Sequence, residues 1–202
     1  GNSNSSYNNP GSQSNSGNSS SGLNFGSIIG GSSASGGGSV DTSVATGSRA
    51  KRTNIIGGNQ DTITMMVYMC GTDLESRSGM ASSDLQEMAN ATLGSNVNII
   101  VYTGGCSGWK TSGISNSVNQ IYQVQSGGLK PLVKDDGAKP MTDPATLTNF
   151  IQYCNKNYPA NRYELVLWDH GGGSVSGYGY DEKYKSSGSM SLAGIRTALQ
   201  NS

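Results

Sequence analysis

Three short apolar runs constrain the fold of this chain more than any other feature. They occupy residues 62–69 (TITMMVYM), 97–102 (VNIIVY) and 163–168 (YELVLW). Continuous apolar, β-prone runs of this length are typical of strands buried on both faces of a parallel sheet. An amphipathic segment over residues 79–92 separates the first two runs, so residues 62–102 are predicted to form a right-handed β-α-β unit. The sequence therefore predicts an α/β fold with a mostly parallel sheet.

A hairpin is predicted between the second and third apolar runs. Polar and apolar residues alternate over residues 120–125, as in a half-exposed strand. Gly127 and Gly128 then turn the chain, and residues 129–134 return it. We expect this hairpin on or beside the edge of the sheet.

Two helices are predicted in the second half of the chain. Asp143 is an expected N-cap with Pro144 in the first turn, and this helix ends at about Asn157. Cys154 lies on its apolar face and is expected in the core rather than in a site. A second helix begins at Ser191 and reaches the last residues of the chain. A doubly wound sheet would next require another strand, so the fold is expected to be incomplete in this chain.

The first 60 residues differ in composition. Ser, Gly and Asn supply 34 of the first 48 residues, and such a stretch has too little apolar surface to offset its chain entropy. We predict a disordered tether over residues 1–60 and a domain over residues 61–202. The tether fits either a bacterial lipoprotein whose targeting segment has been removed or a simple interdomain linker. The basic cluster at 49–52 is either a site for a trypsin-like cut or a solvated charge cluster.

Charge and cysteine content exclude several classes of protein. The formal net charge is zero, with 13 basic and 13 acidic side chains, so a nucleic-acid partner is not expected. No apolar run approaches the roughly 18 residues that would span a membrane. The three cysteines have no zinc-site spacing, and the single histidine cannot complete one. A disulfide is not excluded, but the spacing does not favour one.

The single histidine, His170, directly follows the third predicted strand in the segment DHGGG. Function in open parallel sheets collects just beyond the carboxyl ends of the strands. A histidine there can take a proton from a nucleophile, and the amide of Gly171 can help hold a developing oxyanion. The alternative is a histidine that only ends the strand and hydrogen-bonds to the loop.

Five blocks, TITMMVYMCGTDLES, DLQEMANA, VNIIVYTGG, YELVLWDHGGG and GYGYDE, follow in this order over residues 61–202. This series resembles the clostripain-like cysteine peptidases, which share a clan with caspases, gingipains and legumain. The resemblance implies a caspase-like three-layer sandwich and a Cys–His dyad, with His170 as the base and the Gly171 N–H as part of the oxyanion hole.

The resemblance also implies where the rest of the enzyme lies. The family's nucleophile is a cysteine at the end of the next strand, beside an acidic residue that favours cleavage after Arg or Lys. Residues 171–202 contain no cysteine. We therefore expect the C-terminal remainder of the same protein to be the partner that carries the nucleophile, and the chain alone to be inactive. Protein or peptide substrates are expected. The expected location is secreted or at the bacterial cell surface, and lipid anchoring through a removed N-terminus is one form that it could take.

A polar loop over residues 174–190 is the expected site of self-cleavage. Many members of the family cut themselves between the histidine and the cysteine, and loop tips of small residues are accessible to peptidases. Lys183 and Lys185 lie in this loop, flanked by Ser and Gly. Cleavage is therefore expected after Lys183 or Lys185.

Four further residues follow strands closely enough to line the same cleft. Cys70 ends the first run and could form a self-sufficient dyad with His170, although the family places the nucleophile elsewhere. Cys106 lies in a loop after the second run. Asp73 and Asp181 could shape the site or hold calcium, which some relatives need, but no loop has dense oxygen-ligand spacing. We predict no cofactor and no metal site, with calcium left open.

Two other functions use the same residues. HGGG after an apolar strand is also the oxyanion loop of lipases and esterases, which would require G-x-S-x-G further along the chain. A non-catalytic surface protein could keep a peptidase-like fold for binding. The sequence of the strand that follows residue 202 would distinguish the esterase from the peptidase. Replacement of His170 by Ala would distinguish the non-catalytic surface protein from the peptidase.

Overall fold

The computed structural model of the chain describes residues 56–202. The predicted tether over residues 1–60, apart from its last five residues, and the basic cluster at 49–52 lie outside the described residues. The division between tether and domain therefore stays a prediction. Among residues 56–202, none of the helices combines the length and the apolar character that a membrane crossing requires.

A five-stranded, mostly parallel sheet forms the centre of the described residues. Its strands are β1 (Ile63–Cys70), β2 (Val97–Gly104), β3 (Gln120–Gln125), β4 (Gly128–Val133) and β5 (Arg162–Trp168). They lie in the order β4-β3-β2-β1-β5. β1 is parallel to β2 and β5, whereas β3 and β4 are antiparallel to their neighbours. The predicted α/β class and the hairpin are both confirmed.

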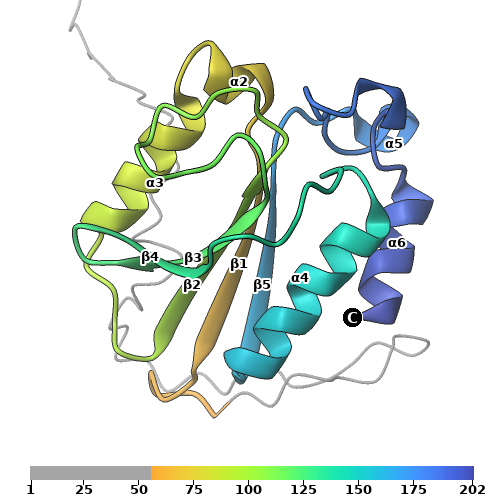
Figure 1. The fold of residues 1–202 in the computed structure, drawn as a ribbon. Helices are drawn as coiled ribbons and strands as arrows, with labels where there is room; N and C mark the ends of the chain where they lie inside the picture. The colour runs from red at the N-terminus through yellow and green to blue at the C-terminus, as the bar shows by residue number, and fades with distance from the viewer. Residues whose placement is uncertain (1–55) are drawn as a thin grey trace, which may run out of the picture. The chain divides into compact units, whose positions relative to one another are not determined.

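Helices cover both faces of the sheet and complete a three-layer arrangement (Figure 1). α3 (Met80–Asn90) lies on one face, and α4 (Pro144–Asn157) and α6 (Leu192–Asn201) lie together on the other. The predicted caps are present: the Asp143 carboxylate accepts from the Ala145 N–H, and the Ser191 hydroxyl accepts from the Gly194 N–H. These bonds satisfy amides that the helix itself leaves unpaired.

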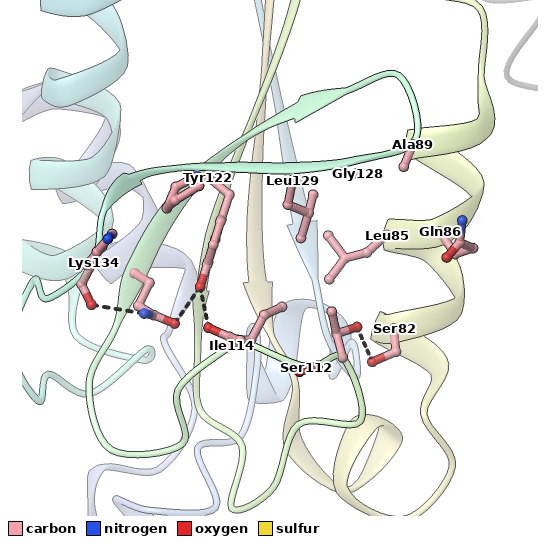
Figure 2. A pocket seen from close by; sticks show the side chains of 14 residues that line it. Ser82, Leu85, Gln86, Ala89, Ser112, Ile114, Tyr122, Gly128, Leu129 and Lys134 are labelled. Atoms are coloured by element: carbon pink, nitrogen blue, oxygen red, sulfur yellow. Dashed lines mark hydrogen bonds between the residues drawn. The ribbon is translucent and has the colours of Figure 1, made fainter.

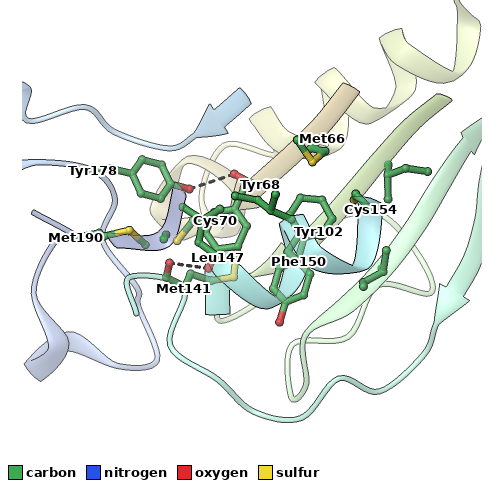
Figure 3. Packing of buried hydrophobic residues seen from close by; sticks show 14 residues of the cluster. Met66, Tyr68, Cys70, Tyr102, Met141, Leu147, Phe150, Cys154, Tyr178 and Met190 are labelled. Atoms are coloured by element: carbon green, nitrogen blue, oxygen red, sulfur yellow. Dashed lines mark hydrogen bonds between the residues drawn. The ribbon is translucent and has the colours of Figure 1, made fainter. Parts of the chain in front are cut away.

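The core between the sheet and α4 is built from aromatic rings (Figure 3). Tyr68 stacks on Tyr102 with centroids 5.4 Å apart, and the Phe150 ring lies against both. Aromatic pairs of this kind stabilise by about 0.5–1.5 kcal/mol beyond their buried area. The Tyr68 hydroxyl donates to the Met141 carbonyl at 2.8 Å. Cys154 is fully buried in this cluster, which confirms its predicted place in the core.

The prediction of full burial is wrong for β5. All its residues except Tyr163 are half-buried, and Tyr163 is exposed. The reason is the strand order: β5 is the last strand of the sheet in the described residues and pairs only with β1. Apolar composition alone cannot separate an edge strand from a central one.

Two segments near the strand ends contain short helical turns. The chain after β1 continues at once into a short helix, α2 (Thr72–Ser76). The expected loop over residues 174–190 contains a turn of helix, α5 (Gly173–Ser176), and a 3-10 turn, η1 (Lys185–Ser187). Tyr178 also pairs with Gly171 and Met190. The loop is therefore folded back on the body of the protein.

Candidate active site

The parallel strands β1, β2 and β5 end at the same edge of the sheet, and α2 and α5 lie there (Figure 1). Met69 in β1 lies opposite Trp168 in β5, so the segments that follow these two strands are neighbours. His170 projects from the end of β5, and its Nε2 lies 2.9 Å from Asp73 Oδ1 in α2. Two residues 97 positions apart thus meet at the strand ends.

The contact with Asp73 has a chemical consequence for the ring of His170. A neutral imidazole has one N–H donor and one acceptor nitrogen, and a carboxylate can only accept. Nε2 is therefore the protonated nitrogen when it donates to Asp73, which leaves Nδ1 as the basic one. The hydrogen bond from His170 also holds the pKa of Asp73 below its ordinary value. Both side chains remain partly exposed, at 52% and 39%.

The glycine segment after His170 includes a main-chain donor, the Gly171 N–H, that is not used within the described residues. The amides of Gly172 and Gly179 donate to the carbonyls of Gly177 and His170, whereas within the described residues no acceptor lies against the Gly171 N–H. A Cβ at Gly172 would lie 2.4 Å from the Ser176 Cβ, so the turn requires glycine there. A Cβ at Gly171 would meet nothing within 4 Å, so this position is open to a ligand.

Cys70 does not line the cleft, and that prediction is wrong. The side chain is fully buried, and its thiol donates to the Tyr180 carbonyl at 3.5 Å. Burial raises the pKa of the thiol well above its ordinary value, and the charges of Asp169 and Asp181 raise it further. A neutral, inaccessible thiol is a poor nucleophile, so the geometry gives no support to a Cys70–His170 dyad.

Cys106 is also buried rather than cleft-lining. It is 1% exposed, and a Cβ at Gly71 would lie 2.8 Å from its own Cβ, so the two segments are closely packed. Burial raises the pKa of Cys106 to about 11. None of the three cysteines forms a disulfide.

Asp181 closes a turn instead of facing the cleft. It is 1% exposed. Its Oδ2 accepts from the Met141 N–H, and its Oδ1 accepts from the N–H groups of Lys183 and Tyr184. The prediction that Asp181 lines the cleft is therefore wrong.

The residues present do not fit a calcium site. No group of three or more His, Cys, Asp or Glu side chains gathers as metal ligands within residues 56–202. Both oxygens of Asp181 already accept main-chain bonds, and Asp73 is engaged by His170. We derive no step through a metal.

The two lysines of the predicted cleavage loop differ in their surroundings. Lys183 is half-buried, and its ammonium group donates to the Ser117 carbonyl at 2.9 Å. Lys185 begins an exposed stretch that continues to Ser189. The structure therefore separates two sites that look alike in the sequence.

Sequence reasoning missed two carboxylates that lie near the strand ends, Asp169 and Glu182. Asp169 accepts the N–H of His170 at 2.6 Å. Glu182 accepts both the N–H and the hydroxyl of Ser107 and the hydroxyl of Ser76, so it joins three segments at the strand ends. Their position within conspicuous motifs, DHGGG and GYGYDE, was the only available signal.

A separate cavity of about 510 Å³ lies between α3, the loop after β2 and the β3–β4 hairpin (Figure 2). Several of its polar groups pair with one another: the Tyr122 hydroxyl contacts Gln120 and the Gly113 carbonyl, and the Ser82 hydroxyl accepts from Thr111. None of the lining residues belongs to the segment around His170. The cavity is therefore distinct from the histidine site.

The fold and the site define an α/β protein with a histidine and a glycine turn at the carboxyl ends of its parallel strands. Residues 67–202 match the model of the clostripain family, peptidase C11, so the chain belongs to the clostripain family.

Known relatives agree with this assignment over part of their length. Clostripain from Hathewaya histolytica is 28% identical over 134 residues, which cover 57% of this chain and 25% of the relative. A secreted C11 cysteine protease from Bacteroides thetaiotaomicron, solved with an irreversible peptide inhibitor, superposes with a TM-score of 0.51 at 22% identity, covering 70% of this chain and 39% of that one. The chain thus spans well under half the length of these two relatives, and the structural likeness supports the caspase-like fold.

Proposed function

We propose that this chain is the histidine-bearing part of a cysteine endopeptidase that cleaves after Arg or Lys. The observation that carries the proposal is the placement of His170 in a clostripain-family chain: its ring is oriented by Asp73 and lies next to the unengaged Gly171 N–H. The nucleophilic cysteine belongs to the C-terminal remainder of the same protein. The burial of Cys70, Cys106 and Cys154 supports this, because none of them is accessible to a substrate.

The reaction is acyl transfer. The cysteine sulfur attacks the carbonyl carbon after Lys or Arg, and its proton passes to Nδ1 of His170. The Gly171 N–H and the cysteine's own N–H hold the oxyanion. His170 then donates the proton to the leaving amine, and water hydrolyses the thioester that remains. Asp73 keeps Nε2 protonated throughout, so Nδ1 is the nitrogen that exchanges the proton.

Replacement of His170 by Ala in the full-length protein tests this function. We expect kcat/KM for an arginyl or lysyl amide substrate to fall by at least about 100-fold, the low end of general acid–base contributions. Glu87→Gln, an exposed carboxylate on α3, is the matched surface control. Unchanged amide cleavage by the His170→Ala protein would exclude the dyad and leave the non-catalytic alternative in place.

Membership of the clostripain family favours the peptidase over the esterase. An esterase would also need a nucleophilic serine, so a thiol-blocking reagent would leave its activity intact. Loss of amide cleavage after alkylation of the full-length protein is the outcome we expect.

An extracellular location forms part of the proposal. One similar protein is described as secreted, and lipid anchoring through a removed N-terminus would account for a Ser/Gly/Asn-rich tether. Partition of the native full-length protein into detergent, lost after deletion of its lipid-attachment cysteine, would support anchoring. Recovery only in the aqueous phase would contradict it.

A further inference from the structure

The carboxylate of Asp169 is shared by three segments of chain at the strand ends. Its Oδ1 accepts from the His170 N–H at 2.6 Å and from the Thr72 hydroxyl at 3.0 Å. Its Oδ2 accepts from the Tyr180 N–H at 2.7 Å. Asp169 therefore connects the end of β5, the first residue of α2 and the segment that returns after the glycine turn.

The bond to Thr72 acts on a strained residue. Thr72 is fully buried and has a φ of 46°, a left-handed conformation that β-branched residues rarely adopt. Such a conformation persists only where surrounding contacts impose it. The Thr72 hydroxyl is held by Asp169, and the next residue, Asp73, holds the ring of His170.

Asp169 thus reaches His170 by two routes. It binds the main-chain N–H of His170 directly, and it fixes the start of the helix that carries the ring's partner, Asp73. An ionised carboxylate accepts at both oxygens, which matches the three donors. Burial raises the pKa of Asp169, and the bonds from the Tyr180 and His170 amides oppose that rise.

We propose that Asp169 is a positioning residue, which sets the orientation and the tautomer of His170 by holding its main chain and the first turn of α2. The effect of Asp169 on catalysis rests on the proposed function. Its effect on the orientation and tautomer of His170 can be tested without measuring turnover. An amide in place of the carboxylate would present an NH₂ group to one of the donors. We expect that mismatch to release either Tyr180 or the Thr72–Asp73 turn.

Ring ¹⁵N NMR of the chain itself provides the test that needs no activity. His170 is its only histidine, so the histidine signals have a single source. The wild-type chain should show the Nε2–H tautomer, and Asp169→Asn should show a mixture of tautomers. Glu87→Gln is the control and should match the wild type. A folded Asp169→Asn chain with the wild-type tautomer would overturn the proposal.

A second pair of variants keeps the proposal testable if Asp169→Asn does not fold. Thr72→Val removes the hydroxyl that donates to Asp169, whereas Thr72→Ser retains it. We expect Thr72→Val to show the same mixture of tautomers and Thr72→Ser to resemble the wild type. If Thr72→Val kept the wild-type tautomer while folded, the route through α2 would be excluded.

Kinetics of the full-length protein then separate this proposal from the proposed function. A displacement of about 1 Å in a reacting group can cost about 100-fold in rate, so Asp169→Asn should lower kcat by up to that factor with little change in KM. Asp169→Glu, which restores both acceptor oxygens, should recover part of the loss. If His170→Ala is inactive but Asp169→Asn is fully active, only the positioning role fails. If His170→Ala is fully active, the proposed function itself fails.

Discussion

At the scale of single residues, the site depends on one oriented ring. The contact between His170 and Asp73 is solvent-exposed on both sides, and exposed ion pairs contribute little to stability. Its value lies in selecting which ring nitrogen carries the proton. A substitution of Asp73 should therefore change catalysis far more than folding.

The prediction for Asp73 follows from this separation. In the full-length protein, Asp73→Asn should lower kcat by at least about tenfold, because an amide can donate to Nε2 and reverse the tautomer. The thermal midpoint should stay close to that of the wild type. Asp135→Asn is the control, since its exposed carboxylate only accepts from the Gly137 N–H. An unchanged kcat would show that Asp73 does not orient the ring.

At the scale of elements, the segment after His170 is a folded loop with one accessible stretch. Asp181 accepts the main-chain N–H groups of Lys183 and Tyr184, the two residues that a cut after Lys183 would separate. The ammonium group of Lys183 also donates to the Ser117 carbonyl. A substrate must leave its turn to enter a peptidase cleft. The exposed residues from Lys185 to Ser189 have fewer such bonds to break.

We therefore predict that self-cleavage, if the proposed function holds, follows Lys185 rather than Lys183. Lys185→Gln should abolish the cut in the full-length protein, and the matched variant Lys183→Gln should leave it intact. N-terminal sequencing of the heavy chain would identify the bond. A heavy chain that begins at Tyr184 would show that the bonds to Asp181 do not protect this turn.

Elements held by their own sequence were predictable, and those held by distant partners were not. The apolar run of β1 and the cap at Asp143 each carry a local signal, and both lie where expected. By contrast, α2 is stabilised by Glu75, which is fully buried and accepts from Ser82 and Lys110. No sequence pattern around Glu75 predicts its contacts with those two residues.

The candidate site divides in the same way. His170 could be singled out because it directly follows an apolar strand and precedes glycines. The burial of Cys70 and Asp181 could not be predicted from their nearness to strand ends, because it depends on contacts with distant residues. The Cys70 thiol donates to the Tyr180 carbonyl, and the Asp181 carboxylate accepts from the Met141 N–H. The role of Asp169 likewise depends on Thr72, 97 residues earlier.

At the scale of the whole molecule, the site exists only when the sheet is assembled. β1 lies between β2 and β5, so strand pairing brings together the ends that carry Asp73 and His170, which are 97 residues apart in the sequence. The same assembly removes every cysteine of this chain from solvent. We therefore predict that none of these three thiols reacts quickly in the native protein.

Alkylation of the chain by iodoacetamide tests this last inference. Burial raises the pKa of Cys106 to about 11 and that of Cys154 to about 12, so at pH 8 only about one Cys106 thiol in 1,000 is ionised. The native chain should resist labelling at pH 8, and denaturant should expose all three thiols. Because the thiolate fraction rises about tenfold per pH unit below the pKa, labelling of Cys106 should increase before that of Cys154 as the pH is raised. Rapid labelling of Cys70 in the native chain at pH 8 would instead restore the Cys70–His170 dyad as a candidate and make a nucleophile outside this chain unnecessary.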